Sequence, residues 1–224
     1  MQLNDGIIET DFLVIPDETK YWFVRASLKA EYYQDFKYNN FIAIGDNDVK
    51  LENLHAIPQR LRETTSTHKE EYKRIFNEAY LTLLRNSTKF KSLQKSEQAD
   101  EIEKMKRSSS ISATKTFSFV EEMDIGDYVL VPYKRSEVFL MGIVLSDTFD
   151  GPIDHEYLGK DLEYPISDYE KKRRVLWIKE IDQDELPESL LWIQTGQRAI
   201  FDISKNANEI NPVISNEYIY KGNV

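Results

Sequence analysis

An aromatic segment that contains an arginine is the part of the sequence best suited to bind a ligand. Residues 21–26 are YWFVRA. Trp22 offers a stacking surface, and Arg25 offers a planar set of hydrogen-bond donors. A charged residue is rarely buried in an apolar strand without a partner, so Arg25 either lies at an edge or points into a site. Trp22 suits a core position as well as a pocket wall.

A run of cations is the second candidate for binding chemistry. Lys171, Lys172, Arg173 and Arg174 are consecutive, and six further lysines and arginines lie between residues 89 and 107. Cations that contact phosphates supply most of the affinity of a protein for nucleic acid. We therefore expect residues 171–174 to contact a nucleic-acid backbone. A solvated charged face is the alternative interpretation.

Motifs for catalysis are not found in the sequence. It has no cysteine, and it lacks P-loop, dinucleotide-binding, zinc-protease and serine-hydrolase patterns. His155 stands between Asp154 and Glu156 and could join a metal site, although a histidine in such a loop is more often solvated. We therefore expect no enzymatic activity and no cofactor.

The composition restricts the class of protein. The chain has 224 residues, 41% of them hydrophobic, and a net charge of -10. This apolar share is enough for a folded core. The acidic balance argues against broad tracking of a phosphate backbone but leaves room for a local basic patch. The sequence has no apolar stretch of about 20 residues and no recognisable signal peptide, so we expect a cytoplasmic protein.

Aromatic and β-branched residues predict strands near both ends of the chain. The stretch between residues 26 and 40 is ambiguous, although Ala30, Tyr33 and Phe36 could mark a short helix. Gly142 is typical of a bulge or a close packing point. Gly126 and Asp127 predict a turn before a strand. The predicted strands are residues 21–26, 40–45, 127–132, 137–146, 173–180 and 198–203.

The middle of the chain is predicted to be helical. Residues 66–86 carry apolar side chains at i, i+3, i+4, i+7, i+8 and i+11, and Ser66 or Thr67 could cap the start. A weak helix near residues 95–106, a serine-rich linker and a short helix within 111–123 follow. We therefore predict a single domain over residues 1–224, with residues 59–115 as a helical insertion.

Four segments in this order resemble one known family. They are YWFVRA at 21–26, FIAIG at 41–45, FVEEMDIGDYVLVP at 119–132, and RRVLWIK at 173–179. The set is similar to the PUA-like/EVE-like modules at the N-terminus of Mrr-type restriction endonucleases and related prokaryotic defence proteins. The resemblance implies an α+β fold, a small PUA-like β-barrel with an inserted helical segment. Related sequences commonly carry Trp after the second segment, where this chain has Asp46.

The resemblance also implies a function. Such barrels often bind nucleic acid, and several flip a modified base into an aromatic-lined pocket, which needs stacking surfaces and hydrogen-bond donors. The chain would then be a recognition module for nucleic acid, with modified DNA as one candidate, in a defence or restriction system that includes an effector protein or domain. The implied pocket residues are Trp22, Arg25, Phe41, Gly45 and Trp177.

Two other functions fit the residues. One is an acidic adaptor that binds a partner protein and no nucleic acid, using the acidic surface and the aromatic helix. The other is a sensor for a small nucleotide in the same pocket. The adaptor is favoured if the lysines and arginines do not converge around Trp22 and Arg25.

Overall fold

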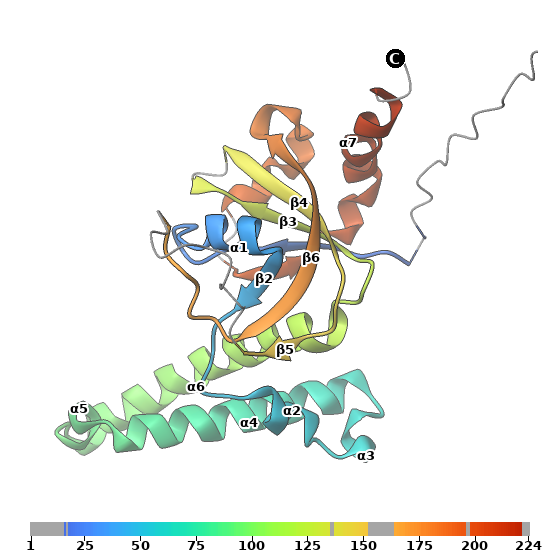
Figure 1. The fold of residues 1–224 in the computed structure, drawn as a ribbon. Helices are drawn as coiled ribbons and strands as arrows, with labels where there is room; N and C mark the ends of the chain where they lie inside the picture. Colours follow the sequence, from blue (N-terminus) through green and yellow to red (C-terminus); the bar gives the residue numbers. More distant parts are fainter. Residues whose placement is uncertain (1–15, 17, 135–136, 152–163, 196–197, 221–224) are drawn as a thin grey trace, which may run out of the picture.

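A curled, half-barrel sheet and a long helical arm make up the described part of the chain (Figure 1). The computed structural model describes residues 16, 18–134, 137–151, 164–195 and 198–220. The mixed α+β class is confirmed, and each of the six predicted strands is present. The strands are β1 (Tyr21–Val24), β2 (Phe41–Ile44), β3 (Tyr128–Pro132), β4 (Val138–Val144), β5 (Phe149–Asp150), β6 (Lys171–Asp182) and β7 (Ile200–Asp202).

The sheet has the order β2-β6-β4-β3-β1-β7, and β5 pairs with β6. Strands β1 and β3 are parallel, and the other pairs are antiparallel. The first four residues of β6 pair with β2, and its remainder pairs with β4, so this long strand connects the two halves of the curl. The ladder between β4 and β6 shifts register at Gly142, where a Cβ atom would lie 2.5 Å from the Trp177 ring. Glycine is therefore required at the predicted bulge.

Both faces of the sheet are buried at β1. Along β1, Trp22 and Val24 pack into one hydrophobic cluster with α1 (Tyr33–Asn39), whereas Tyr21 and Phe23 pack into a second cluster on the opposite face. The second cluster is closed by Leu186, which follows a 3₁₀ segment (Gln183–Glu185), by a second 3₁₀ segment (Glu188–Thr195) and by α7 (Ala207–Tyr220). Burial on both faces explains why β1 is apolar at every position.

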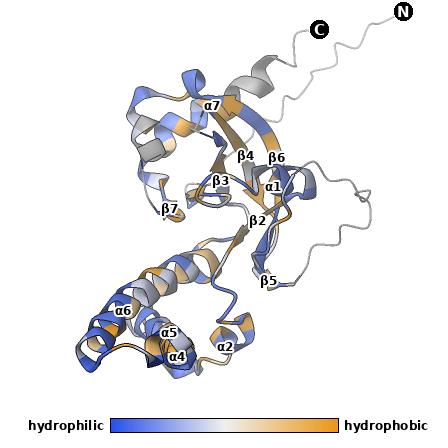
Figure 2. Ribbon diagram, turned by 90° about the vertical axis from the view of Figure 1, so that its left-hand side faces the viewer, coloured by the Kyte–Doolittle hydropathy of each residue, from blue (hydrophilic) through white to orange (hydrophobic). Residues whose placement is uncertain are grey.

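The arm is formed by residues 51–117, which follow β2 and precede β3 in the sequence. It extends away from the sheet (Figure 2). Helix α4 begins after Thr64, whose side chain accepts a hydrogen bond from the backbone of Thr67, so the cap is two or three residues earlier than predicted. The helices of the arm are α2 (Leu51–His55), α3 (Gln59–Arg62), α4 (Thr65–Asn86), α5 (Thr88–Lys91) and α6 (Lys95–Phe117).

The predicted serine-rich linker is wrong, because residues 107–110 lie inside the continuous helix α6. Ser109 and Ser112 are buried where α6 packs along α4. Small side chains at these positions allow two helices to approach closely, and burial of the shared face outweighs the low helix propensity of serine.

A π-helix, η1 (Ser118–Glu122), joins the arm to the sheet. The buried guanidinium of Arg173 donates to the carbonyl oxygens of Phe119 at 2.8 Å, Val120 at 3.1 Å and Ser146 at 3.0 Å. The irregular turn leaves carbonyl groups that ordinary helix bonding does not satisfy. Arg173 therefore fastens the end of the arm to β6, and we call these contacts the Arg173 clasp.

Among the described residues, no helix combines the length and the apolar composition that crossing a bilayer requires.

Candidate ligand-binding cavity

Two of the predicted pocket residues, Arg25 and Gly45, line one cavity of about 140 Å³. The cavity lies where the ends of β1 and β2 meet the sheet-proximal end of α6. Its walls therefore come from the sheet and from the arm together. The lining residues are Arg25, Ser27, Leu28, Ala43, Ile44, Gly45, Lys115, Tyr169 and Ala199.

Arg25 follows directly after β1 and is held there by its backbone. Its N–H group donates to the carbonyl oxygen of Ala199 at 2.8 Å, which extends the pairing of β1 with β7. The guanidinium carbon lies 5.2 Å from the centroid of the Phe23 ring. Burial lowers the pKa of Arg25 from its usual value, but a guanidinium remains charged at neutral pH. Arg25 thus places a cationic hydrogen-bond donor in the cavity wall.

An aromatic ring forms another wall because residue 45 is glycine. A Cβ atom at Gly45 would lie 3.2 Å from the ring of Tyr169, closer than ordinary contact. The Tyr32 ring packs edge-on against Tyr169, with centroids 5.1 Å apart. Tyr169 is therefore fixed in orientation. Nothing in the sequence singled out Tyr169, because its position beside Gly45 depends on the pairing of β2 with β6.

The arm contributes Lys115 through a polar network. Lys115 Nζ lies 2.5 Å from Asp46 Oδ2, and Asp46 Oδ1 accepts hydrogen bonds from the hydroxyl groups of Tyr80 and Ser112 at 2.7 and 3.0 Å. Burial opposes ionisation of Asp46, but Lys115 and the hydroxyl groups outweigh it and hold the pKa of this carboxyl below its usual value. Asp46 therefore ties both long helices to the end of β2.

The rim of the cavity exposes an apolar side chain. Leu28 is 86% exposed, the largest exposure among the described large hydrophobic residues. It lies in a turn in which Ser27 and Ala30 both have positive φ angles, 79° and 54°. This conformation is uncommon for residues other than glycine and concentrates at functional sites. Lys29 and Arg198, both exposed, adjoin the lining residues Leu28 and Ala199 in sequence.

Trp22 and Phe41 are buried in the core and do not line the cavity, so their predicted role as pocket walls is wrong. The indole N–H group of Trp22 donates to the buried carboxylate of Asp127 at 2.8 Å, which satisfies its polar edge inside the sheet. Trp177 is half-buried against the same core and donates to the carbonyl oxygen of Phe36. The turn predicted at Gly126–Asp127 is confirmed, with Gly126 at φ 97°.

The predicted backbone-binding role of Lys171, Lys172 and Arg173 is also wrong, because all three are buried. Lys171 donates to the carbonyl oxygen of Asp46, and Lys172 donates to that of Gly151, while Arg173 forms the clasp. Burial lowers the pKa of each of the three. Only Arg174 of this run is exposed.

No metal site is formed within the described ranges, where no three histidine or acidic residues gather. His155, together with Asp154 and Glu156, lies outside the described residues. The cavity itself presents the guanidinium of Arg25, the Lys115 ammonium group that is paired with Asp46, an aromatic ring and backbone groups. This arrangement suits a planar or anionic group and contains no nucleophile with an adjacent base.

A model of a protein family, described as a domain of unknown function (DUF8426), matches residues 63–204. The chain belongs to this family. No curated protein and no solved structure matches the chain significantly. The range that defines the family contains α4 to α6, strands β3 to β7, and the cavity residues Lys115, Tyr169 and Ala199. Strands β1 and β2, with Arg25 and Gly45, precede the matched range.

Proposed function

We propose that the protein is a recognition module that binds nucleic acid and takes a single base into the cavity between Arg25 and Tyr169. We also propose that the curled sheet is a PUA-like barrel, because the four segments that resemble that family lie together in it. The observation that carries the functional proposal is the cavity itself, where an arginine and a fixed aromatic ring converge beside a glycine.

The size and chemistry of the cavity favour a base over a whole nucleotide. Its 140 Å³ is well below the roughly 300–1,000 Å³ of pockets that enclose drug-sized ligands. The Tyr169 ring offers a face for stacking, and the guanidinium of Arg25 can donate two hydrogen bonds to the acceptor edge of a base.

Leu28 would support extrusion of the base. Proteins that open a base step often insert an apolar side chain into the stack. An exposed leucine at the rim is placed to fill the space that an extruded base leaves.

The negative net charge of the protein is consistent with a small number of contacts to phosphates. Lys29 and Arg198 are exposed and are the sequence neighbours of residues that line the cavity, whereas the cations of residues 171–173 are buried. Neutralising about two phosphates predicts a slope near −2 in a plot of log affinity against log salt concentration. Base recognition would then supply much of the specificity, and an effector protein or domain of a defence or restriction system would act on the bound nucleic acid.

The test is a fluorescence-anisotropy titration of labelled single-stranded and duplex DNA. Matched oligonucleotides would carry unmodified, methylated or hydroxymethylated bases, each at two salt concentrations. We expect affinity to depend on the base at one position and Arg25→Ala to weaken it by about 5- to 100-fold. Arg85→Ala, at an exposed position of α4, is the control.

Two results would contradict the proposal. No binding at either salt concentration would remove nucleic acid as the ligand. A rise in melting temperature with free mononucleotides, and none with DNA, would assign the cavity to a nucleotide sensor instead.

A further inference from the structure

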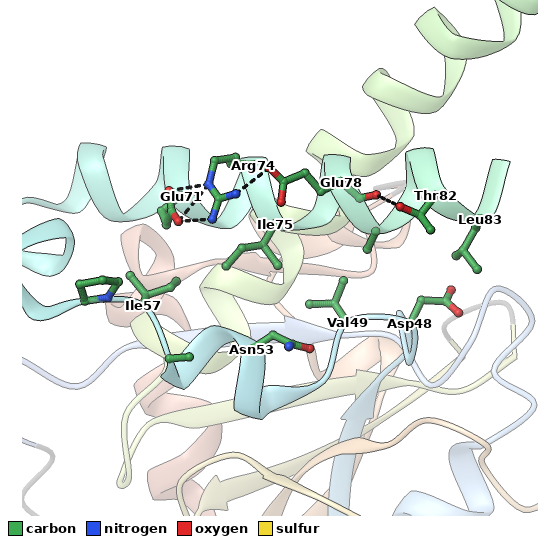
Figure 3. A pocket seen from close by; sticks show the side chains of 13 residues that line it. Asp48, Val49, Asn53, Ile57, Glu71, Arg74, Ile75, Glu78, Thr82 and Leu83 are labelled. Atoms are coloured by element: carbon green, nitrogen blue, oxygen red, sulfur yellow. Dashed lines mark hydrogen bonds and ion pairs between the residues drawn. The ribbon is translucent and has the colours of Figure 1, made fainter. Parts of the chain in front are cut away.

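A larger hollow lies on the arm, on the side of α4 that faces α2 (Figure 3). It has a volume of about 610 Å³, and none of its lining residues is shared with the cavity beside Arg25. We call it the arm groove. Its lining residues on α4 include Glu71, Arg74, Ile75, Glu78, Ala79 and Leu83.

The floor of the arm groove is apolar. Tyr72 and Phe76 on α4 are fully buried in the cluster that also contains residues of α2 and α6. The neighbouring positions Ile75 and Ala79 are only partly buried, and Leu83 is 48% exposed. Because α2 has only five residues, it covers part of this face and leaves the rest open.

The apolar row has the spacing of a helix-binding surface. Ile75, Ala79 and Leu83 stand at i, i+4 and i+8 on α4, a span of about 12 Å at 1.5 Å per residue. This length matches two turns of a second helix, whose own apolar residues would recur every three or four positions.

The rim of the arm groove is acidic. Asp48, Glu71 and Glu78 line it, against the single cation Arg74. Arg74 is already paired with both glutamates, since its Nη2 lies 2.6 Å from Glu71 and its Nη1 lies 2.6 Å from Glu78 (Figure 3). Arg74 therefore orders the rim without cancelling its negative charge, and a phosphate-bearing ligand would be repelled.

We propose that the arm groove binds a short amphipathic helix of a partner protein, with apolar residues on one face and lysines or arginines beside them. The apolar floor accounts for the hydrophobic face, and the acidic rim accounts for the basic flanks. The surface is small, so the complex is a weak and reversible one, with a dissociation constant of roughly 1–100 μM.

The test uses the full chain and three synthetic peptides of about 16 residues labelled with fluorescein. The first has leucines at helical spacing and lysine flanks. The second has the same leucines with glutamate flanks, and the third has the lysines with scrambled leucines. We expect the first peptide to bind at least about tenfold more tightly than either of the others.

A matched pair of charge reversals distinguishes peptide binding in the arm groove from nonspecific electrostatic attraction of the peptide to the arm. Glu78→Lys changes the rim at a side chain that is 63% exposed, so folding is unaffected. Glu103→Lys changes an equally exposed glutamate, 62%, that is likewise paired along its own helix but lies on α6 outside the groove. Glu78→Lys should weaken the first peptide about tenfold and strengthen the second, whereas Glu103→Lys should change neither by more than about twofold.

Equal effects of the two substitutions would overturn the proposal, as would equal binding of all three peptides or no binding by any. The result is independent of the nucleic-acid proposal, because Arg25→Ala leaves the groove intact and Glu78→Lys leaves the cavity intact.

Discussion

The cavity beside Arg25 and the arm groove differ in almost every physical respect. The cavity is small and is lined by two cations and an aromatic ring on sheet and helix ends. The arm groove is more than four times larger, lies between helices and has an acidic rim. Opposite charge at two separate hollows means that one ligand cannot satisfy both. A recognition module that also engages a partner protein would need this division.

The largest effect is expected from a substitution that tests whether the sheet and the arm unfold as one unit. Arg173→Met removes the guanidinium hydrogen bonds to three carbonyl oxygens and releases the end of the arm from β6. The Phe119 carbonyl oxygen then keeps only the longer bond from the Thr148 hydroxyl group at 3.3 Å among the bonds described. We expect a loss of about 3–5 kcal/mol in the free energy of unfolding, measured by urea denaturation. If the substituted chain does not fold, Arg173→Lys, which retains one donor group, should give a smaller loss.

Arg174→Met is the control for the clasp, because Arg174 is exposed on the same strand. It should change stability by less than about 0.5 kcal/mol. The wild-type chain should unfold in one transition. Two separate transitions in the Arg173 variant would show that the clasp joins the arm to the sheet. An unchanged stability would contradict this assignment.

A smaller effect is expected at Asp46, which connects the cavity wall to the arm. Asp46→Asn removes the ion pair with Lys115 and should cost about 2 kcal/mol at pH 7. The pKa of Asp46 is lower in the folded chain than its ordinary value of 3.8. The contribution of the carboxylate is therefore complete above about pH 4 and is lost as pH falls through the lower folded pKa.

Unfolding measured from pH 7 to pH 2 checks this prediction. The difference in stability between the wild-type chain and Asp46→Asn should narrow below about pH 4. Asp100→Asn, at an exposed position of α6, should show no such difference. A gap that stays constant down to pH 2 would contradict the ion-pair explanation.

The smallest effect is expected at Leu28, where a substitution should separate ligand binding at the cavity from binding at the arm groove without changing stability. Leu28→Ala should leave the melting temperature unchanged, because the side chain is exposed. It should weaken DNA binding by about three- to tenfold, since the space left by an extruded base would be less well filled. Binding of the basic peptide to the arm groove should not change.

Leu176→Ala removes another exposed leucine, one on β6 that does not line the cavity, and serves as the control. Equal loss of DNA affinity in the two variants would reject a specific role for Leu28.

Local patterns were sufficient to predict most of the elements. The strands follow from aromatic and β-branched runs, and α4 follows from its apolar spacing. Helix α6 could not be predicted as one helix, because its serines look like a linker until the partner helix is known. Helix α7 was not anticipated.

The candidate site was only partly predictable. Arg25 was found because a charged residue is unusual in an apolar strand, whereas Gly45 was named only through the family resemblance. Residues 171–173 were wrongly predicted to be accessible, since consecutive cations look solvated in the sequence. Lysine and arginine have long apolar stems, and here their charged ends reach backbone carbonyl groups of distant turns. Only the tertiary structure reveals such partners.

The helical arm also has a consequence for the order of assembly. Strand β2 pairs with residues 171–174 and β1 pairs with residues 128–130, so the sheet depends on contacts between segments more than 100 residues apart. Helices α4 and α6 pack against each other through a short connection and can form early. Once formed, this hairpin brings the start of η1 close to the end of β2. The arm therefore shortens the effective loop that the chain must close before the sheet can nucleate.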